Sequence, residues 1–233
     1  MPIYCGDIAR NYHCEGFRLN SVKVTDLDAQ DFLRALDHQV IRDKGGCRFM
    51  MPLSRAYETI FWEGAVGVTP RAITLWIEPV ITIATAARLH LDYGWPKSNI
   101  GMQSKTGEFD FMVYLDTAGS LLAVGGEVKK SVKELDQLMS LMTGFKIGQY
   151  PAITSVPKFS LNAYKKWLGL FHCKAPFFWA VGPAGYTQLF RMSYEADGNM
   201  TFEAVSNDLL KYTSDKFMWS SIKSNENGTF QLE

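Results

Sequence analysis

The chain has 233 residues, of which 47% are hydrophobic and 21% charged, and its formal net charge is zero. This length and composition fit one large globular domain, or a domain with an appendage, with enough apolar residues for a sizeable core. No apolar run reaches the roughly 18 residues that span a bilayer. Residues 1–16 also lack the apolar centre of a signal peptide, so we expect a cytoplasmic protein with no membrane partner.

The N-terminal part of the chain predicts one helix followed by short strands. Residues 25–43 combine early acids with an apolar stripe that ends before two glycines, which is typical of a helix. The aromatic-rich residues 48–67 predict short strands. We interpret residues 1–68 as an N-terminal appendage, or as part of the same domain as residues 69–233.

A second helix is predicted over residues 69–93, where apolar side chains recur every three or four residues. Pro79 interrupts this pattern, so it either kinks the helix or begins a new one. Glu78 therefore sits at or near a helix start, where the helix dipole favours an acid whatever its function.

The apolar period then changes from 3.6 to 2, which predicts a β-hairpin. Residues 108–115 alternate, residues 116–120 form a turn, and residues 121–129 return. The elements expected after the hairpin are helices over 131–144 and 158–171, strands over 177–181, 188–194 and 200–205, and a short helix from Leu209. This order predicts an α/β sandwich with a mixed central sheet.

The hydrophobic pattern also predicts the register of the hairpin. A two-residue loop at Ala118-Gly119 makes one face apolar or glycine throughout, with Phe109, Phe111, Val113 and Leu115 opposite Val128, Gly126, Val124 and Leu122. A one-residue slip would mix the two faces. A three-residue loop with a bulge is an alternative route to similar facing.

The other face of the hairpin carries the candidate site. In this register Asp110 lies opposite Glu127, and Glu108 lies opposite Lys129. Facing Cβ atoms are about 5 Å apart, so two carboxylates repel unless a cation lies between them or one is protonated. A divalent metal with oxygen ligands at about 2.1 Å would remove that conflict. The alternative is a solvated surface with one Glu108–Lys129 pair.

These residue types suit phosphodiester hydrolysis. A hard cation held by carboxylates activates water and neutralises phosphate charge. A neighbouring lysine orients or deprotonates the water and stabilises the developing charge. Residues 121–175 contain eight lysines against three acids, a local charge of +5, which either binds phosphates or forms an ordinary solvated surface.

Asp110 and the run Glu127-Val128-Lys129, followed by a helix, resemble the PD-(D/E)xK nuclease superfamily. The resemblance covers about residues 70–145, with Phe109 in place of the family's proline. It implies a restriction-endonuclease-like fold, a mixed central β-sheet flanked by helices, and a Mg²⁺-dependent endonuclease that cuts DNA, as a homodimer where both strands are cut. By this resemblance Asp110, Glu127 and the Val128 carbonyl bind Mg²⁺, for which Mn²⁺ can substitute, and Lys129 serves catalysis.

The resemblance also suggests residues outside the hairpin. The family often adds a metal-binding glutamate from the preceding helix, here Glu78, and some members have a glutamine in or after the following helix, here Gln137 or Gln149. Lys130, Lys133 and Gln137 are the candidate nucleic-acid contacts.

Three alternatives stay open. The same chemistry serves RNA as well as DNA. A nuclease-like fold can also bind nucleic acid or a protein partner without cutting. A zinc module around His13-Cys14 is the third, although the four cysteines, Cys5, Cys14, Cys47 and Cys173, form no CxxC pair and are better read as reduced thiols.

Overall fold

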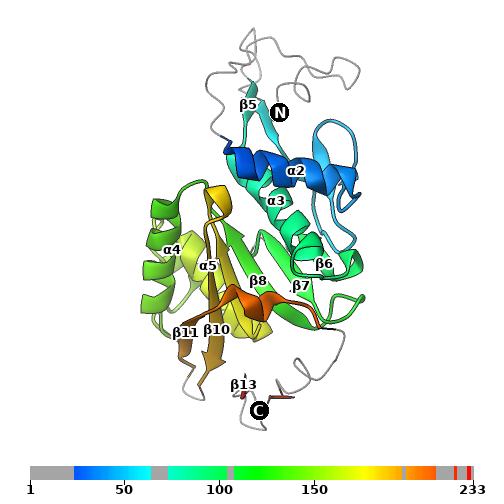
Figure 1. The fold of residues 1–233 in the computed structure, drawn as a ribbon. Helices are drawn as coiled ribbons and strands as arrows, with labels where there is room; N and C mark the ends of the chain where they lie inside the picture. Colours follow the sequence, from blue (N-terminus) through cyan, green and yellow to red (C-terminus); the bar gives the residue numbers. More distant parts are fainter. Residues whose placement is uncertain are drawn as a thin grey trace.

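The computed structural model describes residues 24–63, 73–103, 108–195, 198–213, 223–224 and 230–231. Across these ranges a six-stranded sheet forms the centre of the fold, in the order β11-β10-β9-β8-β7-β6 (Figure 1). Its strands are β6 (Ile100–Met102), β7 (Phe111–Tyr114), β8 (Leu122–Val128), β9 (Phe177–Val181), β10 (Thr187–Tyr194) and β11 (Met200–Val205). β8 and β9 are parallel, and the other neighbours are antiparallel. The predicted α/β fold with a mixed central sheet is confirmed.

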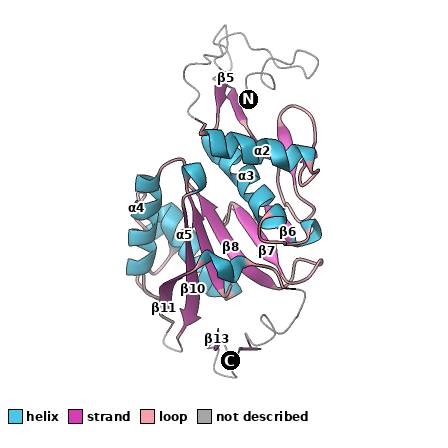
Figure 2. Cartoon of the chain, in the orientation of Figure 1, coloured by secondary structure: helices cyan, strands magenta, loops and turns pink. Residues whose placement is uncertain are grey.

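Helices cover both faces of this sheet (Figure 2). They are α2 (Asp26–Asp37), α3 (Ile77–Leu91), α4 (Val132–Gly144) and α5 (Leu161–Cys173). α3 shares one core with the sheet face that carries Phe111 and Val124, and α2 packs against α3. α4 and α5 share a second core with the face that carries Met112 and Phe178. The sheet is therefore buried between two helical layers.

Shorter elements surround the central sheet. β1 (Arg42–Asp43), β2 (Arg48–Met50) and β3 (Glu58–Thr59) form a small antiparallel sheet, β4 (Phe61–Glu63) pairs with β5 (Ile73–Leu75), and β12 (Lys223–Ser224) pairs with β13 (Phe230–Gln231). Short 3-10 helices lie at η3 (Lys97–Asn99), η4 (Ile153–Ser155), η5 (Pro183–Gly185) and η6 (Asn207–Leu210). No helix in the described ranges has the length and apolar character needed to cross a membrane.

The predicted boundary at residue 68 falls in a stretch outside the described residues, as do residues 1–23. Residues 24–63 nevertheless bury Phe32, Phe49 and Ile60 in the same core as α3 and the sheet. The described part of the predicted appendage therefore shares its core with the rest of the fold, while the division itself stays a prediction.

Capping residues decide where two of the helices begin. Thr25 accepts a hydrogen bond from the Asp28 amide at the start of α2 (3.2 Å), and Ser131 accepts one from the Glu134 amide at the start of α4 (3.3 Å). α2 ends at Asp37, earlier than predicted, because Arg42–Asp43 pairs with β2 instead. The prediction for α4 is confirmed.

The second predicted helix begins later than its apolar spacing indicates. Ile73–Leu75 forms strand β5, paired with β4, and α3 starts at Ile77. Pro79 therefore falls in the first turn of α3, where an amide hydrogen would have no helical partner. Of the two alternatives for Pro79, the structure shows the one in which it begins a helix, and Glu78 lies in that first turn.

The predicted hairpin register is confirmed at the pairs Phe111–Gly126 and Val113–Val124. A β-bulge follows, and Tyr114 pairs with Leu122 in place of the predicted Leu115. The Asp116 carboxylate accepts a hydrogen bond from the Ser120 amide (2.8 Å) across a loop of residues 116–120. The predicted two-residue loop is therefore wrong, because the bulge shifts the register before the turn.

Phe109 lies on the opposite side of the sheet from the one predicted. It packs in the core with α4 and α5, whereas Phe111 packs against α3. β7 begins only at Phe111, and the Asp110 amide donates to the Gly126 carbonyl (2.9 Å). The strict alternation predicted for residues 108–115 therefore does not reach back to Phe109.

Gly126 is required by the close approach of Phe111. A Cβ atom on Gly126 would lie 1.9 Å from Cζ of the fully buried Phe111 ring. Gly126→Ala should therefore lower the free energy of unfolding by about 1–3 kcal/mol through overpacking. Urea denaturation measures this, with Gly144→Ala as the control because a Cβ there meets nothing within 4 Å. Equal stability of both variants would contradict the packing argument.

Candidate active site

The predicted carboxylates meet at one end of the central sheet. Glu127 lies near the end of β8, Lys129 comes directly after this strand, and Asp110 stands just before β7. The Asp110 carboxylate accepts a hydrogen bond from the Val128 amide (2.9 Å), and Glu78 Oε1 lies 3.4 Å from the Lys130 amide. The Lys129 ammonium contacts Glu127 Oε1. The hairpin and the start of α3 thus bring Glu78, Asp110, Glu127 and Lys129 together.

Glu127 is an acid with no access to solvent. Its exposed fraction is 0%, and it lies on the sheet face that packs against α5. Burial raises the pKa of its carboxyl group to about 8, with repulsion from Asp110 acting in the same direction and two lysines opposing it. This is the electrostatic conflict between Asp110 and Glu127 that the register predicted.

Lys129 is a charged amine inside the same cluster. Burial alone lowers the pKa of its ammonium group, but Glu127, Asp110 and Glu78 together outweigh that effect and raise the pKa. Its Nζ also donates to the Val128 carbonyl (3.0 Å). The Glu108–Lys129 pair of the solvated-surface alternative is not what Lys129 forms, because its ammonium group contacts Glu127 instead.

Lys166 of α5 belongs to the site, although in the sequence it stands out only as one residue of a lysine-rich segment. Its Nζ lies 2.5 Å from Glu127 Oε2 and donates to the Glu108 carbonyl (3.0 Å), while its side chain is 3% exposed. The sequence does contain one indication that Lys166 is buried, because Lys166 shares a helix face with the buried Ala163 and Leu170. A lysine on an apolar helix face needs a buried partner.

Glu58 is a second acid that sequence reasoning missed. It sits in β3, is 3% exposed, and accepts a hydrogen bond from Gln103 Nε2 (2.8 Å). The Gln103 amide in turn donates to the Asp110 carbonyl (2.8 Å). Burial raises the pKa of Glu58 to about 7; the Gln103 hydrogen bond opposes this rise, and the nearby Asp110 and Glu78 add to it. No periodic signal marks Glu58 in its two-residue strand.

The site supplies oxygen donors but not a finished metal cage. Within the described ranges, no three His, Cys, Asp or Glu side chains are grouped closely enough to hold a metal ion as they stand. Carboxylate and carbonyl oxygens are nevertheless the donors that Mg²⁺ prefers, and Asp110, Glu127 and Glu78 provide them near the Val128 carbonyl. The repulsion between Asp110 and Glu127 is what a divalent cation would relieve, so the donor set fits such an ion.

Two of the candidate nucleic-acid contacts lie on α4, the helix that follows the site, and Lys130 lies directly before it. Lys130 pairs with Glu134 at 3.4 Å and is mostly exposed, and Lys133 and Gln137 are exposed on α4. Gln149 lies beyond α4, where its side chain accepts a hydrogen bond from the Lys146 amide (3.1 Å). The two glutamine candidates therefore sit on separate segments.

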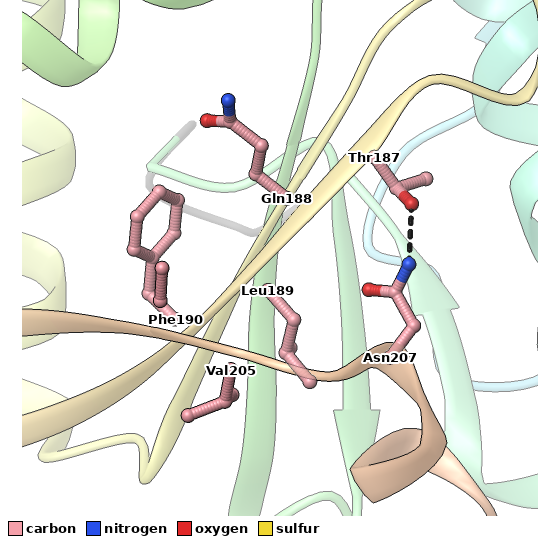
Figure 3. A pocket seen from close by; sticks show the side chains of 7 residues that line it. Thr187, Gln188, Leu189, Phe190, Val205 and Asn207 are labelled. Carbon is pink, nitrogen blue, oxygen red and sulfur yellow. Dashed lines mark hydrogen bonds between the residues drawn. The ribbon is translucent and has the colours of Figure 1, made fainter.

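A shallow pocket of about 260 Å³ lies at β10 and β11, away from the carboxylates (Figure 3). Asn207 donates a hydrogen bond to the Thr187 hydroxyl (2.7 Å) at its rim. Gln188, which lines the pocket, lies opposite Ala180 of β9 in the sheet, and Ala180 lies opposite Glu127 of β8. Two strand spacings, roughly 10 Å, separate this pocket from Glu127.

Comparison of the chain with protein-family models, with curated proteins and with solved structures finds no match. The interpretation of the site therefore depends on its own residues. Of the cysteines, Cys47 is buried and Cys173 is exposed. Cys5 and the His13-Cys14 pair lie outside the described residues, so the zinc-module alternative is untested.

Glu58 should make stability depend on pH. Its pKa is about 7 in the folded chain against an ordinary 4.5, so the unfolded chain ionises first and stability falls as pH rises from 4.5 through 7. Glu58→Gln, which stays neutral, should be more stable than the unaltered chain above pH 7, by about 3 kcal/mol. The difference should vanish below pH 4.5.

Urea denaturation between pH 4 and 8 measures this difference. Glu203→Gln is the matched control, because Glu203 is exposed and pairs with Arg191 at the surface. A Glu58→Gln effect that does not change with pH would contradict the proposed burial of an ionisable Glu58.

Proposed function

We propose that this chain is a Mg²⁺-dependent endonuclease that hydrolyses DNA phosphodiester bonds. The observation that carries the proposal is the convergence of Asp110, Glu127 and Lys129 at the ends of two neighbouring strands. Lys129 contacts Glu127, and Asp110 is hydrogen-bonded to the amide of the intervening Val128. Two acids and an amine in one cluster are the groups that metal-assisted phosphate chemistry requires.

The metal ligands in this proposal are Asp110, Glu127, Glu78 and the Val128 carbonyl. When bound there, Mg²⁺ or Mn²⁺ would activate a water molecule and neutralise phosphate charge. The raised pKa of Glu127 supports this assignment, because a carboxyl group that Asp110 and burial push toward protonation gains most from a nearby cation.

Lys129 is the catalytic amine of the proposal. Three carboxylates raise the pKa of its ammonium group, so it carries a positive charge at neutral pH. From the edge of the cluster it can orient the attacking water and stabilise charge on the phosphate. Its contact with the Val128 carbonyl keeps it beside the proposed metal ligands.

The order of elements agrees with the nuclease resemblance. α3 carries Glu78 before the hairpin, the hairpin carries Asp110 and Glu127, and α4 follows directly. We therefore extend the proposal to a restriction-endonuclease-like domain, acting as a homodimer where both DNA strands are cut. Its DNA-contacting face would be the exposed N-terminal part of α4, with Lys130, Lys133 and Gln137.

A nuclease-like domain that binds nucleic acid or a protein partner without cutting is the second candidate. One observation favours it: both oxygens of Glu127 face lysine ammonium groups, so the buried charge is compensated by the chain itself. Calorimetric titration with Mn²⁺ separates the two candidates. Absence of Mn²⁺ binding, together with retained DNA binding, would favour this second function.

Lys129→Met should reduce cleavage of plasmid and branched DNA in Mg²⁺ at least about 100-fold, because it removes a charge-stabilising donor from the reaction. EDTA should abolish cleavage by the unaltered chain. Lys44→Met, at an exposed lysine in the N-terminal part, is the matched control. Equal rates for Lys129→Met and the control would contradict the catalytic assignment.

Lys133→Ala should weaken duplex binding without changing the cleavage chemistry. Each phosphate contact contributes about 0.9 to the slope of log affinity against log salt concentration, so the slope should fall by about 1. Fluorescence anisotropy in EDTA between 50 and 200 mM salt measures it, and Lys44→Ala again serves as control. An unchanged slope would exclude Lys133 from the DNA-contacting face.

A further inference from the structure

Glu127 is held by two lysines that differ in surroundings. Lys129 comes directly after β8, and its side chain is 17% exposed, whereas Lys166 reaches in from α5 and is 3% exposed. Lys129 contacts Oε1, and Lys166 lies 2.5 Å from Oε2. The two oxygens of one carboxylate therefore have separate partners, one beside solvent and one inside the protein.

Lys166 is fixed at its other contacts as well. Its ammonium group donates to the Glu108 carbonyl at 3.0 Å. A Cβ atom on Gly169 would lie 2.8 Å from Glu108 Cβ, so α5 approaches this segment closely. Trp167, the neighbour of Lys166, is fully buried. Lys166 thus has a fixed position from which it constrains Glu127 Oε2.

A catalytic amine and a permanent counter-charge are different tasks. An ammonium group that acts on water and phosphate must be free to leave Glu127, and Lys129 is the more exposed of the two. A fully buried carboxylate that lost its partner would be strongly destabilised. One lysine cannot perform both tasks. If Lys129 is the catalytic amine, Lys166 is the permanent counter-charge of Glu127.

We propose that Lys166 is a positioning residue, which holds Glu127 Oε2 against α5 and so turns Oε1 toward Lys129. This inference rests on the proposed function, because it concerns the orientation of a proposed metal ligand. Groups that orient a ligand in this way are typically worth about 10–100-fold in metal affinity or activity. A purely structural ion pair would affect stability without affecting either.

The test compares Mn²⁺ binding by variants of the full chain. Lys166→Met should weaken Mn²⁺ affinity, measured by calorimetry at neutral pH, by about 10–100-fold. The half-saturating Mn²⁺ concentration for cleavage should rise in parallel, while KM for DNA stays within about threefold because Lys166 is buried away from the surface. Lys165→Met, on the exposed side of the same helix, should keep the Mn²⁺ affinity of the unaltered chain.

Lys166→Gln guards against loss of folding. Glutamine can still donate to the Glu108 carbonyl but carries no charge, and it should weaken Mn²⁺ binding as Lys166→Met does. A folded variant with unchanged Mn²⁺ affinity would overturn the proposal, and so would failure of both variants to fold, which would assign Lys166 to stability. An unaltered chain that binds no Mn²⁺ would instead contradict the proposed function, and this role would fall with it.

Discussion

The burial of one carboxylate, that of Glu127, is the constraint around which the site is arranged. A carboxyl group without solvent can ionise only when other charges and hydrogen bonds surround it. Here the compensation comes from Lys129, directly after β8, and from Lys166 of α5. Lys166 belongs to α5, which is distant in sequence from the hairpin. The packing of α5 on the sheet and the chemistry of the hairpin therefore depend on each other.

Much of the hairpin could be predicted, because its pattern admits few solutions. Alternation with period 2, together with Gly126 opposite Phe111, makes a single register compatible with one apolar face. That register was enough to bring Asp110 beside Glu127. The prediction was wrong where local geometry departs from an ideal ladder, at the bulge before Tyr114 and at Phe109, since periodicity contains no information about either irregularity.

The rest of the site could not be predicted from the sequence, for two physical reasons. Glu58 stands on a two-residue strand, too short for any periodic signal, and reaches the site through Gln103. Lys166 lies on a helix whose apolar face could be recognised, but its partner Glu127 is far away in sequence, and the two meet only once α5 packs on the sheet. Contacts between residues that are distant in sequence leave no local sequence pattern from which they could be predicted.

A structural role alone explains this cluster poorly. Buried ion pairs contribute little to stability compared with apolar residues of similar size, and acids placed within each other's field make the fold less stable. Glu58 and Glu127 both have raised pKa values, partly because Asp110 repels each of them. A fold under selection for stability alone would not need either conflict. Such conflicts are concentrated at functional sites, and a cation attracted to these acids would turn their repulsion into binding energy, which supports the nuclease proposal over a solvated or purely structural surface.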